Sequence, residues 1–114
     1  MKRYERVLAA LSKGQQPTMR VFGNSMLPLI KSKSKLTFAK TDDYQVGDVV
    51  MCRVKGRMID AHKITKIDSD GRHMIANNKG RENGWASQIF GRVIAVNEDP
   101  FGRPVASPAN EVNL

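Results

Sequence analysis

Short apolar segments separated by turn residues are the feature that most restricts the fold of this chain. From Thr18 onward, glycine, asparagine and aspartate interrupt runs of β-branched and apolar residues, at a spacing of about ten residues that is typical of short antiparallel strands. Lys55-Gly56 and Asp70-Gly71 are the tight-turn signals of hairpins. We expect strands at 18–22, 35–40, 48–54, 57–67, 73–77 and 89–96. The pattern predicts a mainly β domain, a small barrel or sandwich.

The first residues follow a helical period instead. Apolar side chains recur at positions i, i+3, i+4 and i+7, which places them on one face of a helix; they are Tyr4, Val7, Leu8 and Leu11. We therefore expect a short amphipathic N-terminal helix over 2–12. Gly14 is a suitable residue to end it.

The chain has the size of one domain. Its 114 residues are enough for one compact core, and we expect a helix and linker over 1–17 and a β domain over 18–96. Residues 97–114 contain prolines but few large apolar side chains, so this part is predicted to be a flexible tail. No apolar run has the length of a membrane span or a secretory signal. The prediction is a cytoplasmic protein without a transmembrane segment.

Cysteine and charge limit the classes of function. Cys52 is the single cysteine and lies in an apolar run, so the sequence predicts a buried strand residue, no metal site and no cofactor. The formal net charge is +8, which favours polyanionic partners: nucleic acid, an anionic membrane surface or an acidic protein. The densest basic stretch holds Lys31, Lys33 and Lys35. These lysines form either an anion-binding patch or a solvated surface, and the sequence leaves both open.

A serine in the segment 22–28, Phe-Gly-Asn-Ser-Met-Leu-Pro, is the first candidate for chemistry. Gly23 lets the chain turn without a steric penalty, and Ser25 then lies at a junction between strand and loop. Met26 can anchor the loop inward. Most serines in such turns only bond to the backbone, so a partner base is needed before Ser25 can be interpreted as a nucleophile.

His62, on the predicted strand 57–67, is the candidate base. Strand alternation places it on the same face as Asp60 and Ile64. A neutral imidazole can accept the proton of a serine hydroxyl, although a single strand histidine is more often structural.

Several short motifs in one order resemble the shared domain of LexA-like repressor peptidases and type I signal peptidases. The motifs are Gly-Asn-Ser-Met-x-Pro, Gly47-Asp48-Val49-Val50, Ala61-His62-Lys63-Ile64 and the final Gly91-Arg92-Val93-Ile94 segment. The resemblance covers residues 18–96 and implies a LexA/signal-peptidase-like β fold. It also implies Ser25 as nucleophile and His62 as general base, with a Ser-His dyad of the histidine subtype of signal peptidase.

The resemblance also shows where this chain differs from the superfamily. The subtype carries an aspartate that supports the histidine, but Arg81 stands near that place and no aspartate follows between Gly80 and Val96. Glu82 is the nearest carboxylate and Asp60 an outside candidate for the group that orients His62. For the oxyanion, the resemblance and chemistry suggest the Ser25 N–H and the Asn24 side chain.

These observations predict a serine endopeptidase that cleaves a protein or peptide substrate. The sequence shows neither the membrane anchor of signal peptidases nor the helix-turn-helix and the Ala-Gly or Cys-Gly self-cleavage site of LexA-like proteins. This is expected for a freestanding, phage-like domain. Two alternatives stay open. One is an inactive basic binding module on the same fold that binds nucleic acid or inhibits an acidic protein. The other is an interaction protein, for which Trp85, predicted to lie in a loop, is either a lid on the core or an interface anchor.

Overall fold

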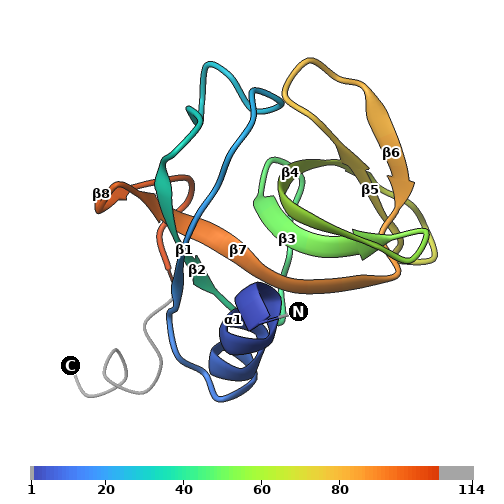
Figure 1. Ribbon diagram of the computed structural model, residues 1–114. Helices are drawn as coiled ribbons and strands as arrows, with labels where there is room; N and C mark the ends of the chain where they lie inside the picture. Colours follow the sequence, from blue (N-terminus) through green and yellow to red (C-terminus); the bar gives the residue numbers. More distant parts are fainter. Residues whose placement is uncertain (1, 106–114) are drawn as a thin grey trace.

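The computed structural model describes residues 2–105, and within them one helix precedes eight strands (Figure 1). The elements, in chain order, are α1 (Lys2–Ser12), β1 (Thr18–Arg20), β2 (Lys35–Ala39), β3 (Val49–Val54), β4 (Arg57–Ile67), β5 (His73–Ala76), β6 (Glu82–Trp85), β7 (Gln88–Val96) and β8 (Asp99–Pro100). The predicted mainly β fold with a short N-terminal helix is confirmed.

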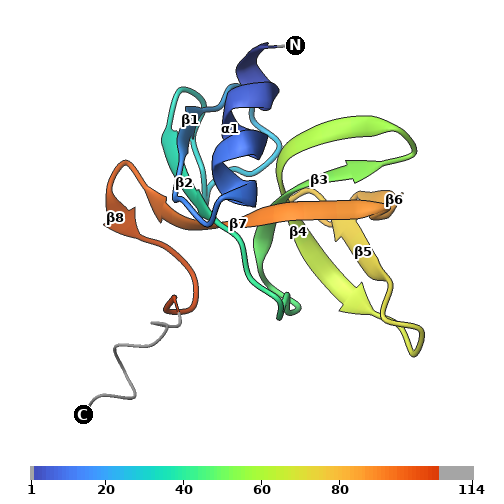
Figure 2. The same ribbon diagram turned by 90° about the horizontal axis from the view of Figure 1, so that it is seen from below.

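All strand pairs are antiparallel, and they join into one sheet. The order across it is β1-β2-β7-β3-β4-β5-β6, with β8 added to the far end of β7. The sheet curls strongly, so that β3, β4, β5 and β6 surround one end of the domain, while α1 lies beside β1, β2 and β7 (Figures 1 and 2). The curl separates two hydrophobic clusters, one on each side of β3 and β4.

The apolar face of α1 closes the larger cluster. Val7 and Leu11 are buried there with Leu36, Phe38 and other core residues, as the helical period predicts. The helix approaches β7 at Gly91, where a Cβ atom would lie 3.0 Å from Leu11 Cδ2. Because that distance is shorter than normal packing, glycine allows the helix to sit this close. At 11 residues, α1 is too short for a membrane crossing, and no other helix occurs among residues 2–105.

The smaller cluster contains Cys52, Val50, Ile64 and Ile75, all fully buried. Burial raises the pKa of the Cys52 thiol to about 12, because a thiolate there would lose its hydration. A thiol that stays protonated is a poor nucleophile. Cys52 is therefore a packing residue, as its apolar surroundings in the sequence indicate.

The prediction that Trp85 lies in a loop is wrong, because Glu82–Trp85 form β6. Gly84 pairs with Ile75 and Trp85 with Met74 of β5. The half-buried indole ring lies under two cations, with the Arg72 guanidinium carbon 4.7 Å and the Lys66 ammonium 5.8 Å from the ring centre. Asn83-Gly84 is a turn signal locally, but pairing with β5 extends the chain instead.

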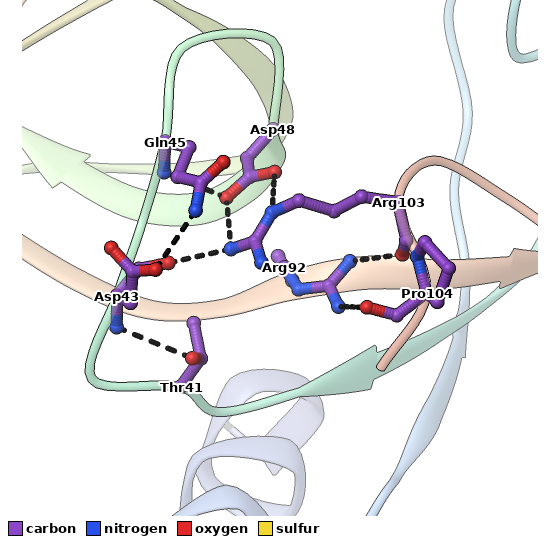
Figure 3. Close-up of polar contacts among 7 residues, drawn as sticks. All are labelled: Thr41, Asp43, Gln45, Asp48, Arg92, Arg103 and Pro104. Carbon is purple, nitrogen blue, oxygen red and sulfur yellow. Dashed lines mark hydrogen bonds and ion pairs between the residues drawn. The ribbon is translucent and has the colours of Figure 1, made fainter. Parts of the chain in front are cut away.

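The segment that follows β7 also differs from the prediction of a flexible tail. Residues 99 and 100 pair with β7, and Arg103 returns to the domain (Figure 3). Its Nε and Nη2 atoms each lie 2.9 Å from a carboxylate oxygen of Asp48, and this bond raises the pKa of Arg103. Arg92, which is buried, donates to the carbonyls of Arg103 and Pro104 at 3.0 Å. Residues 106–114 of the predicted tail lie outside the described residues.

Replacing Arg103 with alanine is expected to lower the free energy of unfolding by about 2 kcal/mol, less than the roughly 3–5 kcal/mol for a fully buried ion pair, because the Arg103 side chain is 30% exposed. The Asp48 side chain is only 5% exposed, so its charge would lose its partner without gaining full hydration. Urea denaturation followed by circular dichroism measures the change. The matched control is Lys35→Ala, because the Lys35–Glu98 pair is exposed and is worth less than about 1 kcal/mol. Equal losses in the two variants would contradict this account.

Candidate active site

The loop after β1 presents Ser25 to solvent. Gly23 adopts a φ of +106°, a conformation that side chains disfavour, and its N–H donates to Ser32 Oγ at 3.0 Å. Ser25 itself is exposed, while Met26 beside it is buried in the core. The loop is thus fixed on both sides of Ser25, as the sequence suggests.

A second loop braces the first. The backbone N–H of Asn78 donates to the carbonyl of Ser25 at 3.0 Å, and the Asn78 side-chain amide donates to the carbonyl of Leu27 at 2.8 Å. These bonds join the loop before β6 to the loop that carries Ser25, and the side-chain bond links two residues that are 51 positions apart in the sequence. The position of Ser25 is therefore held from outside its own segment.

His62 is directed toward Ser25 by an irregularity in β4. In the β3–β4 pair, Val50 is opposite His62 and Cys52 is opposite Ile59, so Asp60 and Ala61 together face the single residue Met51. Such a bulge turns the following side chains and is common beside active sites. Ala61 is buried in the larger cluster and Ile64 in the smaller one. Met58 packs with Ala61 in the larger cluster and Ile59 packs with Ile64 in the smaller one, although simple alternation would place the members of each pair on opposite faces.

The ring of His62 connects two other side chains. Its Nε2 atom lies 3.0 Å from Ser25 Oγ, and its Nδ1 atom lies 2.7 Å from Asn83 Oδ1. Because an amide oxygen can only accept, Nδ1 carries the proton. The lone pair is then on Nε2 and faces the serine hydroxyl. This tautomer is the one in which imidazole can take the hydroxyl proton.

Asn83, from β6, is a site residue that was not predicted from the sequence. The predicted partner of His62 was a carboxylate, since the resembled subtype uses aspartate, but a neutral asparagine holds the base in some peptidase sites. The signal was present one residue after Glu82, in a segment interpreted as a loop.

The two carboxylates suggested as orienting groups have other partners. Glu82 Oε2 lies 3.6 Å from Lys66 Nζ. Asp60 pairs with Arg3 at 2.9 Å and accepts a hydrogen bond from the Tyr4 hydroxyl, both from α1. Burial and the Asp60 bond raise the pKa of Tyr4 to about 12, so the phenol stays protonated and donates. The structure therefore places Asn83, rather than Glu82 or Asp60, against His62.

A cavity of about 270 Å³ opens beside Ser25 and His62. Apolar side chains, among them Val21, Met26 and Ile30, line it together with the polar groups of Ser25, His62 and Asp60. Such a mixed pocket next to a nucleophile can receive one side chain of a substrate.

The oxyanion candidates differ in their environment. No hydrogen bond among the described residues uses the Ser25 N–H, so this donor is available. Asn24 is exposed, and its carbonyl accepts from the Leu27 N–H at 3.2 Å. The side chain of Asn24 is held by no described contact.

The three lysines of the predicted anion-binding patch are not used alike. Lys35 pairs with Glu98 at 2.9 Å, and Lys33 lies in a left-handed turn with a φ of 73°. Lys31 is exposed. Anion binding by these lysines stays a prediction. Within residues 2–105, no three histidine, cysteine or acidic side chains are grouped as metal ligands would be.

The curled antiparallel sheet, with the Ser25 loop beside one edge of β4, has the arrangement expected of the LexA- and signal-peptidase-like superfamily. The family model described as Peptidase S24-like matches residues 2–94, and the chain belongs to this family. A comparison with curated proteins found no match. The predicted superfamily is confirmed, whereas the histidine subtype and the role of each site residue stay predictions.

Proposed function

We propose that this protein is a serine endopeptidase in which Ser25 is the nucleophile, His62 the general base and Asn83 the residue that positions His62. The observation that carries the proposal is the chain of hydrogen bonds from Ser25 Oγ through the His62 ring to Asn83 Oδ1, at 3.0 and 2.7 Å. Both distances are within the range for direct proton transfer and orientation.

The reaction begins when Ser25 Oγ attacks a peptide carbonyl while His62 Nε2 takes its proton. The N–H of Ser25 stabilises the oxyanion, with Asn24 as a side-chain candidate. The carbon–nitrogen bond then breaks, and His62 gives its proton to the leaving amine. Water attacks the acyl-enzyme with His62 again as base, which releases the acid and restores Ser25.

The open edge of β4 is suited to an extended peptide. Along Arg57–His62, β4 pairs only with β3 among the described residues, since its pairing with β5 begins at Lys63. The edge leads directly to His62 and therefore to Ser25. A peptide added as a strand would gain main-chain hydrogen bonds there, which supports a protein or peptide substrate.

The experiment is covalent labelling with a fluorophosphonate, which reacts with an activated serine. We expect one adduct on the folded protein, located at Ser25 by peptide mass spectrometry, and no adduct on Ser25→Ala or on the urea-unfolded protein. His62→Ala should react far more slowly, because the hydroxyl loses its base. An unlabelled wild-type protein would favour the alternative of an inactive binding module.

A further inference from the structure

Two cavities lie on opposite faces of the open β4 edge. Met58 and Ile59 line both of them. The cavity beside Ser25 is walled by Val21, Met26 and Ile30 of the larger cluster, whereas the second is walled by Val54 of the smaller cluster. A strand added along this edge would direct alternate side chains to the two faces. The two cavities would thus receive neighbouring residues of one peptide.

The second cavity, of about 510 Å³, is strongly basic. Lys55, Arg57 and Arg81 line it, and none of these cations forms an ion pair with an acidic residue in the described part of the chain. Its one acidic residue, Glu82, is paired with Lys66. The cavity therefore holds positive charge that the protein itself leaves without a counter-charge.

We propose that this basic cavity selects an acidic side chain, aspartate or glutamate, in the peptide that binds along β4. The inference rests on the proposed peptidase function. The cavity also contains Asn83, whose amide bonds to His62, so the acidic side chain would bind close to the reacting centre. Charge complementarity of this kind fixes register and excludes basic peptides at the same place.

The geometry limits where the acidic residue lies in the substrate. From His62 to Arg57 the strand covers roughly 16 Å at the usual rise per residue. An acidic side chain that reaches Arg57 or Arg81 therefore lies within about five residues of the scissile bond. In the bound peptide, this acidic side chain points to the face opposite to that of the side chains that enter the cavity beside Ser25.

A kinetic comparison tests the proposal. A quenched peptide that the wild-type protein cleaves is remade with glutamate, glutamine or lysine at each flanking position in turn. At one substrate position we expect glutamate to give a kcat/KM about tenfold higher than glutamine, and lysine to give the lowest value. A tenfold gain corresponds to two partly exposed ion pairs between the glutamate and cations of the cavity. The Arg57→Glu, Arg81→Glu double variant should lose or reverse this order. The control is Lys13→Glu, Lys40→Glu, which has the same net charge with both changes on exposed residues outside either cavity.

A binding experiment separates failure of this inference from failure of the peptidase assignment. Ser25→Ala protein is titrated against fluorescent extended peptides in which valine alternates with glutamate, glutamine or lysine, and anisotropy is recorded. Tighter binding of the glutamate peptide, lost in the double variant but kept in the control, supports the cavity even if no peptide is cleaved. Equal binding of the glutamate and glutamine peptides would overturn it, whatever the wild-type protein hydrolyses.

Discussion

Ser25→Ala is expected to lower kcat/KM for a peptide substrate by at least about a thousandfold, the scale at which loss of a nucleophile acts in serine peptidases. Without the Oγ atom no acyl-enzyme forms, and His62 has no hydroxyl to deprotonate. The rate of cleavage of a quenched peptide, measured with purified protein, reports the effect.

The same substitution should leave the fold intact, because Ser25 is exposed and its side chain bonds only to His62 among the described residues. Urea denaturation should give a midpoint close to that of the wild type. Ser12→Ala is the matched control, since Ser12 Oγ bonds within α1 to the carbonyl of Ala9 and activity should be unchanged. Hydrolysis that survives in Ser25→Ala would remove Ser25 as the nucleophile.

Asn83→Ala is expected to lower kcat about a hundredfold with little change in KM, in line with general-base contributions of this order. Alanine cannot accept the Nδ1 proton, so the ring is free to rotate and to adopt the other tautomer. Asn83→Asp keeps the acceptor and adds a charge that stabilises the imidazolium formed during the reaction. Its kcat should therefore match or exceed the wild-type value.

The aspartate variant distinguishes positioning from a structural role. If Asn83 only supported the packing of β6, aspartate and alanine would both impair the protein, and the loss would extend to KM and to the urea midpoint. Nitrogen NMR of the His62 ring gives a direct readout, because the Nδ1–H tautomer should persist in Asn83→Asp and be lost in Asn83→Ala. Equal kcat values for the two variants would contradict the assignment.

Local patterns predict much of the fold. The helical period of the first residues anticipated α1, and the limits of β4 agree with the expected strand at 57–67. Contacts between distant residues were not accessible in this way. Arg103 meets Asp48 across 55 positions, and a proline-containing segment gave no sign of that partner. β6 was missed because Asn83-Gly84 has turn chemistry until β5 supplies its hydrogen bonds.

The candidate site was also predictable only in part. The pairing of Ser25 with His62 came from the resemblance of ordered motifs, since spacing alone cannot bring residues 37 apart into contact. The bulge at Asp60 and Ala61 depends on the register with β3, which a single strand does not contain. Asn83 was overlooked because the expectation was a charged partner, whereas geometry requires only an oxygen that accepts.

The open edge of β4 also governs how molecules of this protein meet each other. Unpaired backbone groups at Arg57–His62 are a template onto which a second copy could add its own strand. Each copy carries a formal net charge of +8, and Lys55 and Arg57 stand at the start of this edge, so two copies that approach edge to edge repel each other. The charge that would favour an acidic peptide therefore also opposes the pairing of two copies, and concentrated salt weakens that protection.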